Sequence, residues 1–187
     1  MPRVRSFPPI ESVRARVLVL GSMPGGASLA AGQYYAHPQN LFWRIMLELL
    51  GGEPGLSYPG RIKLIEANGI ALWDVLESCV REGSLDSAIE EATIAVNDFA
   101  SFYRRHPRIE RVFFNGAKAE ASYRRYVRAL VGEVGRPREY LRLPSTSPAH
   151  AALSFGKKLE AWRVVRPRLV SPGALPDARK PTRFMKR

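Results

Sequence analysis

The stretch GSMPGGASLAAGQYYAHPQNLFW, residues 21–43, determines how the rest of this 187-residue chain is interpreted. It follows an apolar run at residues 17–20 and precedes helically spaced apolar residues at 41–50. Open α/β sheets build sites from this order of strand, glycine-rich turn, long loop and helix, at the carboxyl end of a strand. The glycines and Pro24 allow tight turns and close approach of the backbone to a ligand. Because the loop also contains two tyrosines, a histidine and an asparagine, we interpret it as the active site.

Strand-like and helix-like segments alternate along the rest of the chain. Apolar runs predict strands at residues 16–20, 70–73, 111–114 and 140–143. Helical spacing and stop signals predict helices at residues 41–50, 61–67, 98–105 (with Asn97 as the cap), 117–130 and 154–166, whereas the polar segment 78–86 is interpreted as a loop. This alternation predicts an α/β fold, a three-layer sandwich in which helices flank a central, mostly parallel four-stranded sheet.

The predicted globular domain spans residues 16–166. Residues 1–15, which are basic and contain prolines, are interpreted as a peripheral arm. Residues 167–187 have almost no periodic apolar residues and are interpreted as a flexible basic tail that attracts phosphates. Counted from Arg166, this tail has seven basic residues against Asp177, which is +6 of the chain's total of +12. An incidental solvated terminus is the alternative interpretation.

Composition limits the classes of partner and cofactor. The net charge of +12 and a pI near 10.4 favour an anionic partner such as nucleic acid, although basic charge also serves solubility. A single cysteine, Cys79, excludes an intramolecular disulfide and a zinc ribbon. The histidines His37, His106 and His150 lack ligand spacing, so we expect no metal and no cofactor.

The sequence also indicates where the protein acts. No apolar run approaches the ~20 residues that span a bilayer, and the first residues lack the apolar core of a signal peptide. We therefore expect no membrane partner and a cytoplasmic protein, associated with the nucleoid when bound to DNA. We also expect a monomer.

Other loops should meet the first one at the same edge of the sheet. Asp74 follows the second strand, and residues 144–150 follow the fourth. Hydroxyls and exposed N–H groups suit phosphate binding, so Ser145, Thr146 and Ser147 are candidate phosphate ligands. An elaborate helix cap would explain these three residues equally simply.

Three segments carry a family resemblance: GSMPG (21–25), QYYAHPQNLFW (33–43) and LPSTSPAHA (143–151). In this order they resemble the uracil-DNA glycosylase superfamily, and within it the hypoxanthine-DNA (deoxyinosine) glycosylase branch. AHPQNLFW is also similar to the segment AHPxNRFW of the mismatch-specific uracil glycosylases. The resemblance covers roughly residues 17–165. It implies a uracil-DNA glycosylase-like fold and a monofunctional enzyme of base excision repair. Such an enzyme flips out a deaminated base, chiefly hypoxanthine, and hydrolyses its N-glycosidic bond to leave an abasic site.

The chain departs from the superfamily at two positions. Most members carry Asp or Asn, which positions the attacking water, where this chain has Met23. The histidine that opens the second motif of the classical uracil enzymes is replaced by Ser147. The resemblance to the hypoxanthine branch implies that Asn40 handles the water instead. Asn40 is also well placed to cap the helix at residues 41–50, and one asparagine could serve both roles.

The resemblance also suggests residues for the base pocket. Tyr35 aligns with the aromatic residue that stacks on the flipped base, and Tyr34 could assist it, although core packing would explain either residue. Backbone N–H groups near Ser22 and Met23 are candidates to stabilise the departing base.

Four further residues have weaker assignments. Asp74 aligns roughly with the asparagine that reads uracil in relatives, but a helix cap or a surface ion pair would also explain it. His150 is a candidate donor to the base or to a phosphate, or else a cap or core residue. Asn115 is more simply a turn residue before a glycine. Leu153 stands where relatives insert a wedge into the duplex.

Three other functions remain as alternatives. One is an enzyme that removes uracil or xanthine opposite guanine. Another is a non-catalytic DNA-binding member of the superfamily, which Met23 makes conceivable. A nucleotide-binding α/β domain fits poorly, because the loop lacks the Lys-Ser/Thr of a Walker motif. Lys118 is the only lysine near these motifs, so we expect no Schiff-base lyase activity.

Overall fold

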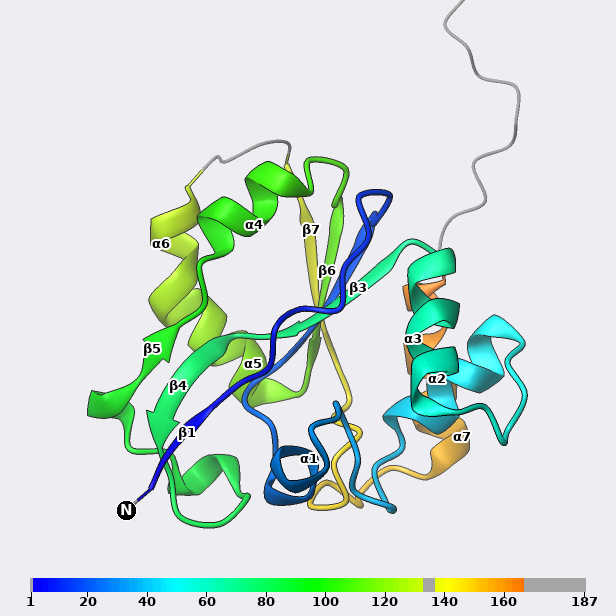
Figure 1. Ribbon diagram of the computed structural model, residues 1–187, viewed down its shortest axis with the longest axis horizontal. Helices are drawn as coiled ribbons and strands as arrows, with labels where there is room; N and C mark the ends of the chain where they lie inside the picture. Colours follow the sequence, from blue (N-terminus) through cyan, green and yellow to red (C-terminus); the bar gives the residue numbers. More distant parts are fainter. Residues whose placement is uncertain (1, 133–136, 167–187) are drawn as a thin grey trace, which may run out of the picture.

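The computed structural model describes residues 2–132 and 137–166, and a parallel four-stranded sheet lies at its centre (Figure 1). Its strand order is β3-β2-β6-β7. The strands are β2 (Val17–Gly21), β3 (Ile70–Asp74), β6 (Arg111–Asn115) and β7 (Glu139–Leu143). Every strand end lies within one residue of its predicted position. The predicted parallel sheet of an α/β fold is therefore confirmed.

Helices cover both faces of this sheet and complete the three layers (Figure 1). One face is covered by α2 (Phe42–Leu50), α3 (Tyr58–Ala67) and α7 (Phe155–Trp162). The opposite face is covered by α4 (Phe99–Arg105), α5 (Ala117–Ser122) and α6 (Arg128–Val131), the last two being joined by a π-helical turn, Tyr123–Val127. A short helix, α1 (Gly26–Ala31), and 3-10 turns at Asp86–Ala88 and Glu91–Thr93 belong to the loops. A third 3-10 turn, Arg163–Val165, directly continues α7 and buries Val165 in the same core cluster. Within the described residues, no helix has the length and apolar character that crossing a bilayer requires.

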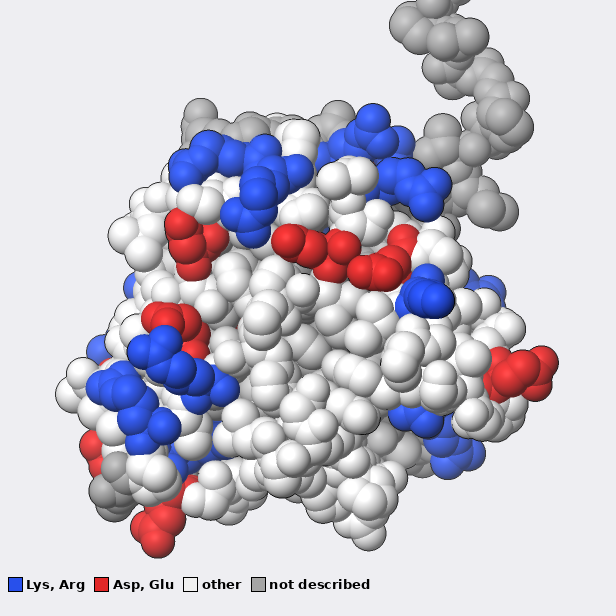
Figure 2. All heavy atoms as spheres, viewed as in Figure 1, with Lys and Arg blue, Asp and Glu red and all other residues white. Residues whose placement is uncertain are grey.

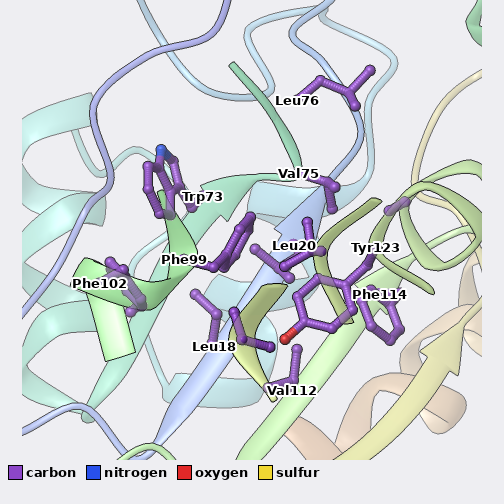
Figure 3. Packing of buried hydrophobic residues seen from close by; sticks show 14 of the residues in the cluster. Leu18, Leu20, Trp73, Val75, Leu76, Phe99, Phe102, Val112, Phe114 and Tyr123 are labelled. Atoms are coloured by element: carbon purple, nitrogen blue, oxygen red, sulfur yellow. The ribbon is translucent and has the colours of Figure 1, made fainter. Parts of the chain in front are cut away.

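Alternate residues of the strands supply the two halves of the core. Leu18 and Leu20 join the cluster beneath α4 and α5, shown in Figure 3, whereas Val17 and Val19 join the cluster beneath α2 and α7. Successive side chains of a strand point to opposite faces, so a strand buried on both sides must be apolar throughout. This is why residues 17–20 form a continuous apolar run.

A second, antiparallel sheet differs from the sequence-based prediction. Its strands are β1 (Arg3–Arg5), β4 (Leu76–Val80) and β5 (Ala95–Val96), in the order β1-β4-β5. The start of the predicted peripheral arm is thus a strand, and residues 78–80 of the predicted loop belong to β4. These strands are short and mix polar with apolar residues, so their pairing, rather than any periodic pattern, decides their conformation. The predicted tail, residues 167–187, lies outside the described residues.

The cap of α4 also differs from the prediction. Asp98, rather than Asn97, caps the helix, because the Asp98 side chain accepts a hydrogen bond from the Ser101 N–H at 2.9 Å. The Asn97 amide instead donates to the backbone carbonyls of Asp74 (2.8 Å) and Leu76 (3.3 Å). It therefore fixes the chain where β3 passes into β4.

Basic side chains lie in separate groups on the face of the molecule that Figure 2 shows. Figure 2 shows Lys and Arg in separate groups, near α4 and over the small sheet, while the lower central surface is largely uncharged. On α5 and the π-helical turn, Lys118 and Arg125 form ion pairs with Glu91, and Arg124 pairs with Glu120 at 2.9 Å. Three basic side chains of this helical region thus lie in ion pairs with two carboxylates.

Trp162 joins the last helix to the sheet and to α2, which gives a test of the packing. Its ring is fully buried, meets Phe42 edge-on at 5.8 Å, and its indole N–H donates to the Pro144 carbonyl at 2.9 Å. Trp162→Ala is expected to lower the free energy of unfolding by about 3–5 kcal/mol, measured by urea denaturation. Trp162→Phe, which keeps most of the packing, should lose less. A loss below about 1 kcal/mol in the alanine variant would contradict this packing.

Candidate active site

A cavity of about 700 Å³ opens at the carboxyl edge of the parallel sheet. The loops that follow β2, β6 and β7 contribute to its wall together with Asp74, the last residue of β3, as the topology predicts. Its size is typical of sites that enclose a small ligand. The predicted residues that line it are Ser22, Met23, Tyr35, Asn40, Asp74, Asn115, Ser145, Ser147 and His150.

Gly21 and Asp74 end neighbouring strands and lie opposite each other in the parallel register. A side chain at Gly21 would place its Cβ 2.3 Å from Asp74 Oδ1 and 3.0 Å from the Tyr35 hydroxyl. The first distance is too short for a real contact, and the second would require the Tyr35 hydroxyl to shift by a few tenths of an ångström. A glycine at position 21 is therefore what allows this carboxyl and this hydroxyl to occupy the floor of the cavity.

Asp74 is a buried carboxyl with an altered protonation state. It is 3% exposed, and its Oδ2 accepts no hydrogen bond from any described residue. Burial raises its pKa to about 8, assisted by the negative charge of Asp86 and opposed by Arg81. Most molecules therefore carry a neutral, protonated Asp74 at pH 7. Neither a helix cap nor an ion pair explains this side chain in the described structure, so both alternative interpretations are wrong.

Tyr35 presents an aromatic ring to the cavity from an unusual backbone conformation. Its φ of 54° lies in the left-handed region, which is uncommon for a residue other than glycine. The ring stacks on Phe42 with centroids 4.1 Å apart. Its hydroxyl is buried and has no hydrogen bond of normal geometry within the described structure. Burial and the charge of Asp74 raise the Tyr35 pKa, and the Asn115 amide opposes this. An unsatisfied buried hydroxyl and a strained backbone are common at binding sites.

Tyr34 has a structural role, in contrast to Tyr35. Its hydroxyl donates to the backbone carbonyls of Phe7 and Pro8, which lie 3.2 Å away. Its own carbonyl accepts from the Trp43 indole N–H at 2.7 Å. Packing, the alternative interpretation of this residue, is therefore correct for most of its side chain.

Asn40 lies at the start of α2 and on the wall of the cavity. Its Oδ1 accepts a hydrogen bond from the Phe42 N–H at 3.0 Å, so the predicted capping role is present. The next residue, Leu41, donates its N–H to the Thr146 carbonyl at 3.0 Å, which ties the two loops together. The Asn40 amide group remains available to a ligand, since no described residue accepts a hydrogen bond from it.

The side chains of the loop at residues 144–150 differ in whether they are buried or line the cavity. Thr146 differs from the prediction, because it is fully buried and its hydroxyl and N–H bond to the Asn115 side chain, both at 2.9 Å. It shapes the loop and cannot reach a phosphate. Ser145 and Ser147 line the cavity, and the exposed His150 stands at its edge. Leu153, at 39% exposure, projects outside the cavity wall.

Ser22 and Met23 follow β2 directly. The Met23 side chain is 7% exposed and belongs to the core cluster beneath α4 and α5. No described residue accepts a hydrogen bond from the N–H of either residue, so both N–H groups are available to a ligand. The Ser22 hydroxyl donates to Asp86 at 2.7 Å.

Sequence reasoning missed the segment at residues 84–91. Ser84, Asp86 and Glu91 line the cavity, together with Lys118 from α5. Their polar pattern was consistent with any surface loop, and only the turn after β4 brings them to the site. Among the described residues, no three His, Cys, Asp or Glu side chains gather as they would to hold a metal ion.

Comparison with known proteins places this geometry in a family. A sequence profile of the Uracil DNA glycosylase superfamily matches residues 8–166. The chain belongs to the uracil DNA glycosylase superfamily. A hypoxanthine DNA glycosylase of Methanosarcina acetivorans is 35% identical over 162 residues, which are 86% of this chain and 96% of that protein. A hypoxanthine DNA glycosylase of Methanosarcina barkeri is 35% identical over 127 residues, 67% of this chain and 78% of that protein.

A solved structure agrees with this assignment. The solution NMR structure of a candidate uracil DNA glycosylase from Methanosarcina acetivorans superposes with a TM-score of 0.70 and 31% identity. The match covers 88% of this chain and 99% of the other. The protein is thus a DNA glycosylase whose substrate is DNA. The match begins at residue 8, inside the predicted arm, consistent with the pairing of Ile10 with β3.

Gly21→Ala tests how closely this glycosylase site is packed. The new Cβ would displace the Asp74 carboxyl, so base release from damaged duplex DNA is expected to fall by about 100-fold, the usual effect of misplacing a catalytic group by about 1 Å. The matched control is Gly55→Ala, whose Cβ would meet nothing within 4 Å. Single-turnover assays on both purified variants measure the effect. Equal activity in the two variants would contradict the packing argument.

Proposed function

We propose that this DNA glycosylase is monofunctional and excises chiefly hypoxanthine from deoxyinosine in DNA. It would flip the nucleotide out of the duplex, hydrolyse the N-glycosidic bond and leave an abasic site for base excision repair. The observation that carries the proposal is a buried, neutral carboxyl, Asp74, on the floor of a cavity lined by Tyr35 and Asn40. The names of the two Methanosarcina relatives support the choice of base.

A neutral carboxyl matches the edge of hypoxanthine. It offers one O–H donor and one carbonyl acceptor, and hypoxanthine offers the O6 acceptor beside the N1–H donor. An ionised carboxylate has no donor, so the oxygen that faces O6 would oppose one acceptor with another. Adenine presents its donor and acceptor in the reverse order, so rejecting it requires that the proton stay on one carboxyl oxygen. The two oxygens have different surroundings, because Oδ1 lies against Gly21 and Oδ2 has no partner among the described residues.

Other residues would hold the flipped nucleotide. The Tyr35 ring would stack on the base, and the N–H groups of Ser22 and Met23 would stabilise charge on the departing base. Ser145 and Ser147 would bind a neighbouring phosphate. The exposed Leu153 would fill the gap left in the duplex, with His150 donating to the base or to a phosphate.

Asn40 would orient the attacking water with the amide group that its capping hydrogen bond leaves available. Met23 cannot do this, since its side chain is packed in the core. The only amine on the described cavity wall belongs to Lys118, which pairs with Glu91. An amine held in an ion pair with a carboxylate is poorly placed to act as a Schiff-base nucleophile, which supports hydrolysis without strand scission.

Uracil is the second candidate base. Its N3–H and O4 present the same donor and acceptor to Asp74, so the pocket floor alone does not separate the two bases. Xanthine opposite guanine and a non-catalytic DNA-binding protein are the remaining alternatives. A panel of duplexes carrying deoxyinosine, deoxyuridine or deoxyxanthosine discriminates between all four. Binding without release of any base would favour the non-catalytic protein.

Asn40→Ala tests the proposed water-positioning residue on a duplex with one deoxyinosine. Release of hypoxanthine is expected to fall by about 100-fold or more, with DNA affinity within a factor of about three, because the lost group acts on the reaction. Asn40→Ser is the matched control, since serine caps helices as well as asparagine does but cannot reach the same water. Full activity in the serine variant would reduce Asn40 to a cap.

Asp74→Asn tests the protonation state of the pocket floor. Asp74 is neutral below its pKa of about 8, so wild-type release of hypoxanthine should decline as the pH rises through that value. An amide keeps one donor and one acceptor and does not ionise, so the variant should remain active without that decline. Single-turnover rates between about pH 6 and pH 10 measure both profiles. The same decline in both proteins would assign the titration to another group.

A further inference from the structure

A second carboxylate, Asp86, reaches the cavity from the turn after β4. Its Oδ1 accepts a hydrogen bond from the Ser22 hydroxyl at 2.7 Å, and Ser22 directly follows the glycine at the end of β2. Asp86 is half-buried and lines the cavity together with Asn40 and Tyr35. Its carboxylate is thus hydrogen-bonded to the first side chain of the loop that follows β2.

Contacts made by the residues before and after Asp86 in the sequence fix its position. Before it, the fully buried Arg81 guanidinium donates to the carbonyls of Pro24 (2.6 Å) and Gly83 (3.1 Å), and the Ser84 hydroxyl accepts from the Gly26 N–H at 2.8 Å. After it, the 3-10 turn Asp86–Ala88 leads to Ile89, which is buried in the same core cluster as Met23. The segment is therefore held against the glycine-rich loop by both polar and apolar contacts.

The negative charge of Asp86 affects the pKa values of two groups on the floor of the cavity. It raises the pKa of Asp74 and, more weakly, that of Tyr35. Two carboxyl groups thus share one cavity in different settings, Asp74 buried without a partner and Asp86 half-exposed and hydrogen-bonded. When two carboxyl groups in one active site have different surroundings, they commonly take different roles in the reaction.

We propose that Asp86 is a catalytic carboxylate that accepts the proton of the attacking water and stabilises the positive charge that develops on the deoxyribose. In this step the water oxygen forms a bond to C1′ as the C1′–N9 bond breaks. The bonding pair leaves with N9 of the base, and one water proton passes to the Asp86 carboxylate, which later returns it to solvent. Asn40 would orient the same water.

This inference rests on the proposed glycosylase reaction, and two substitutions separate it from a purely structural role. Asp86→Asn keeps an oxygen that can accept from Ser22 but removes the charge and the basicity. Asp86→Ala removes the hydrogen bond as well. If Asp86 only anchored Ser22, the asparagine variant would be nearly as active as the wild type and the alanine variant would not. If Asp86 is catalytic, both variants lose activity to a similar extent.

The experiment measures single-turnover base release by the full-length protein on duplexes carrying deoxyinosine, deoxyuridine or deoxyxanthosine, at a pH of about 6. This lies well below the Asp74 pKa of about 8, so loss of the Asp86 charge does not act through ionisation of Asp74. Each variant is compared on whichever base the wild type releases, with DNA affinity measured by fluorescence anisotropy on a duplex with an abasic-site analogue. Glu82→Gln, which removes one exposed negative charge from the same segment outside the cavity wall, is the matched control.

We expect Asp86→Asn to slow release by about 100-fold or more, as loss of a general base usually does. Its DNA affinity should be unchanged or higher, since a negative charge facing phosphates has been removed. A rate within about threefold of that of Glu82→Gln, or an asparagine variant much more active than Asp86→Ala, would overturn the inference. Wild-type release of uracil but not hypoxanthine would overturn the proposed substrate and leave the test of Asp86 intact. A wild type that releases no base would overturn both.

Discussion

The whole site depends on the close approach of two strand ends, where Gly21 of β2 lies opposite Asp74 of β3. Because Gly21 has no side chain, the Asp74 carboxyl and the Tyr35 hydroxyl can both reach the floor of the cavity. Tyr35 then turns through a left-handed conformation and stacks on Phe42, the first residue of α2. The Asn40 side chain accepts a hydrogen bond from the Phe42 N–H at the start of α2. The absence of a side chain at Gly21 thus allows Asp74, Tyr35 and Asn40 to line one cavity together.

The electrostatics of the floor follow from the same packing. A carboxyl enclosed by Gly21, Tyr35 and the sheet loses its hydration, and burial of a charge without a paired partner is costly. The buried Arg81 lowers the pKa of Asp74, but it also donates hydrogen bonds to backbone carbonyls, so it does not neutralise Asp74 fully. Protonation of Asp74 removes the buried charge and so avoids this cost. A group that would be an ion on the surface becomes a neutral donor and acceptor, which is the form that can pair with a lactam edge.

The sequence predicted the central sheet and most of the site loops well because those features rest on local patterns. Apolar runs such as residues 17–20 can be satisfied only by strands buried on both faces, and parallel strands bring their carboxyl ends together. The roles of Thr146 and Asn97 were not predictable, because a hydroxyl or an amide in a loop looks the same whether it faces a ligand or a backbone carbonyl. Asp86 was missed for a related reason. Its approach to Ser22 depends on the small antiparallel sheet, whose strands have no strong periodic pattern.

The proposed role of Asp86 places a catalytic carboxylate on a different loop from the one that follows β2. Several loops meet at one edge of the sheet, so more than one of them can supply an acid to the cavity without any change in architecture. Met23 itself carries an apolar side chain that is buried in the same core cluster as Ile89. Ile89 directly follows the 3-10 turn that begins at Asp86. The first loop and the segment that carries the proposed catalytic carboxylate are therefore anchored in one apolar cluster.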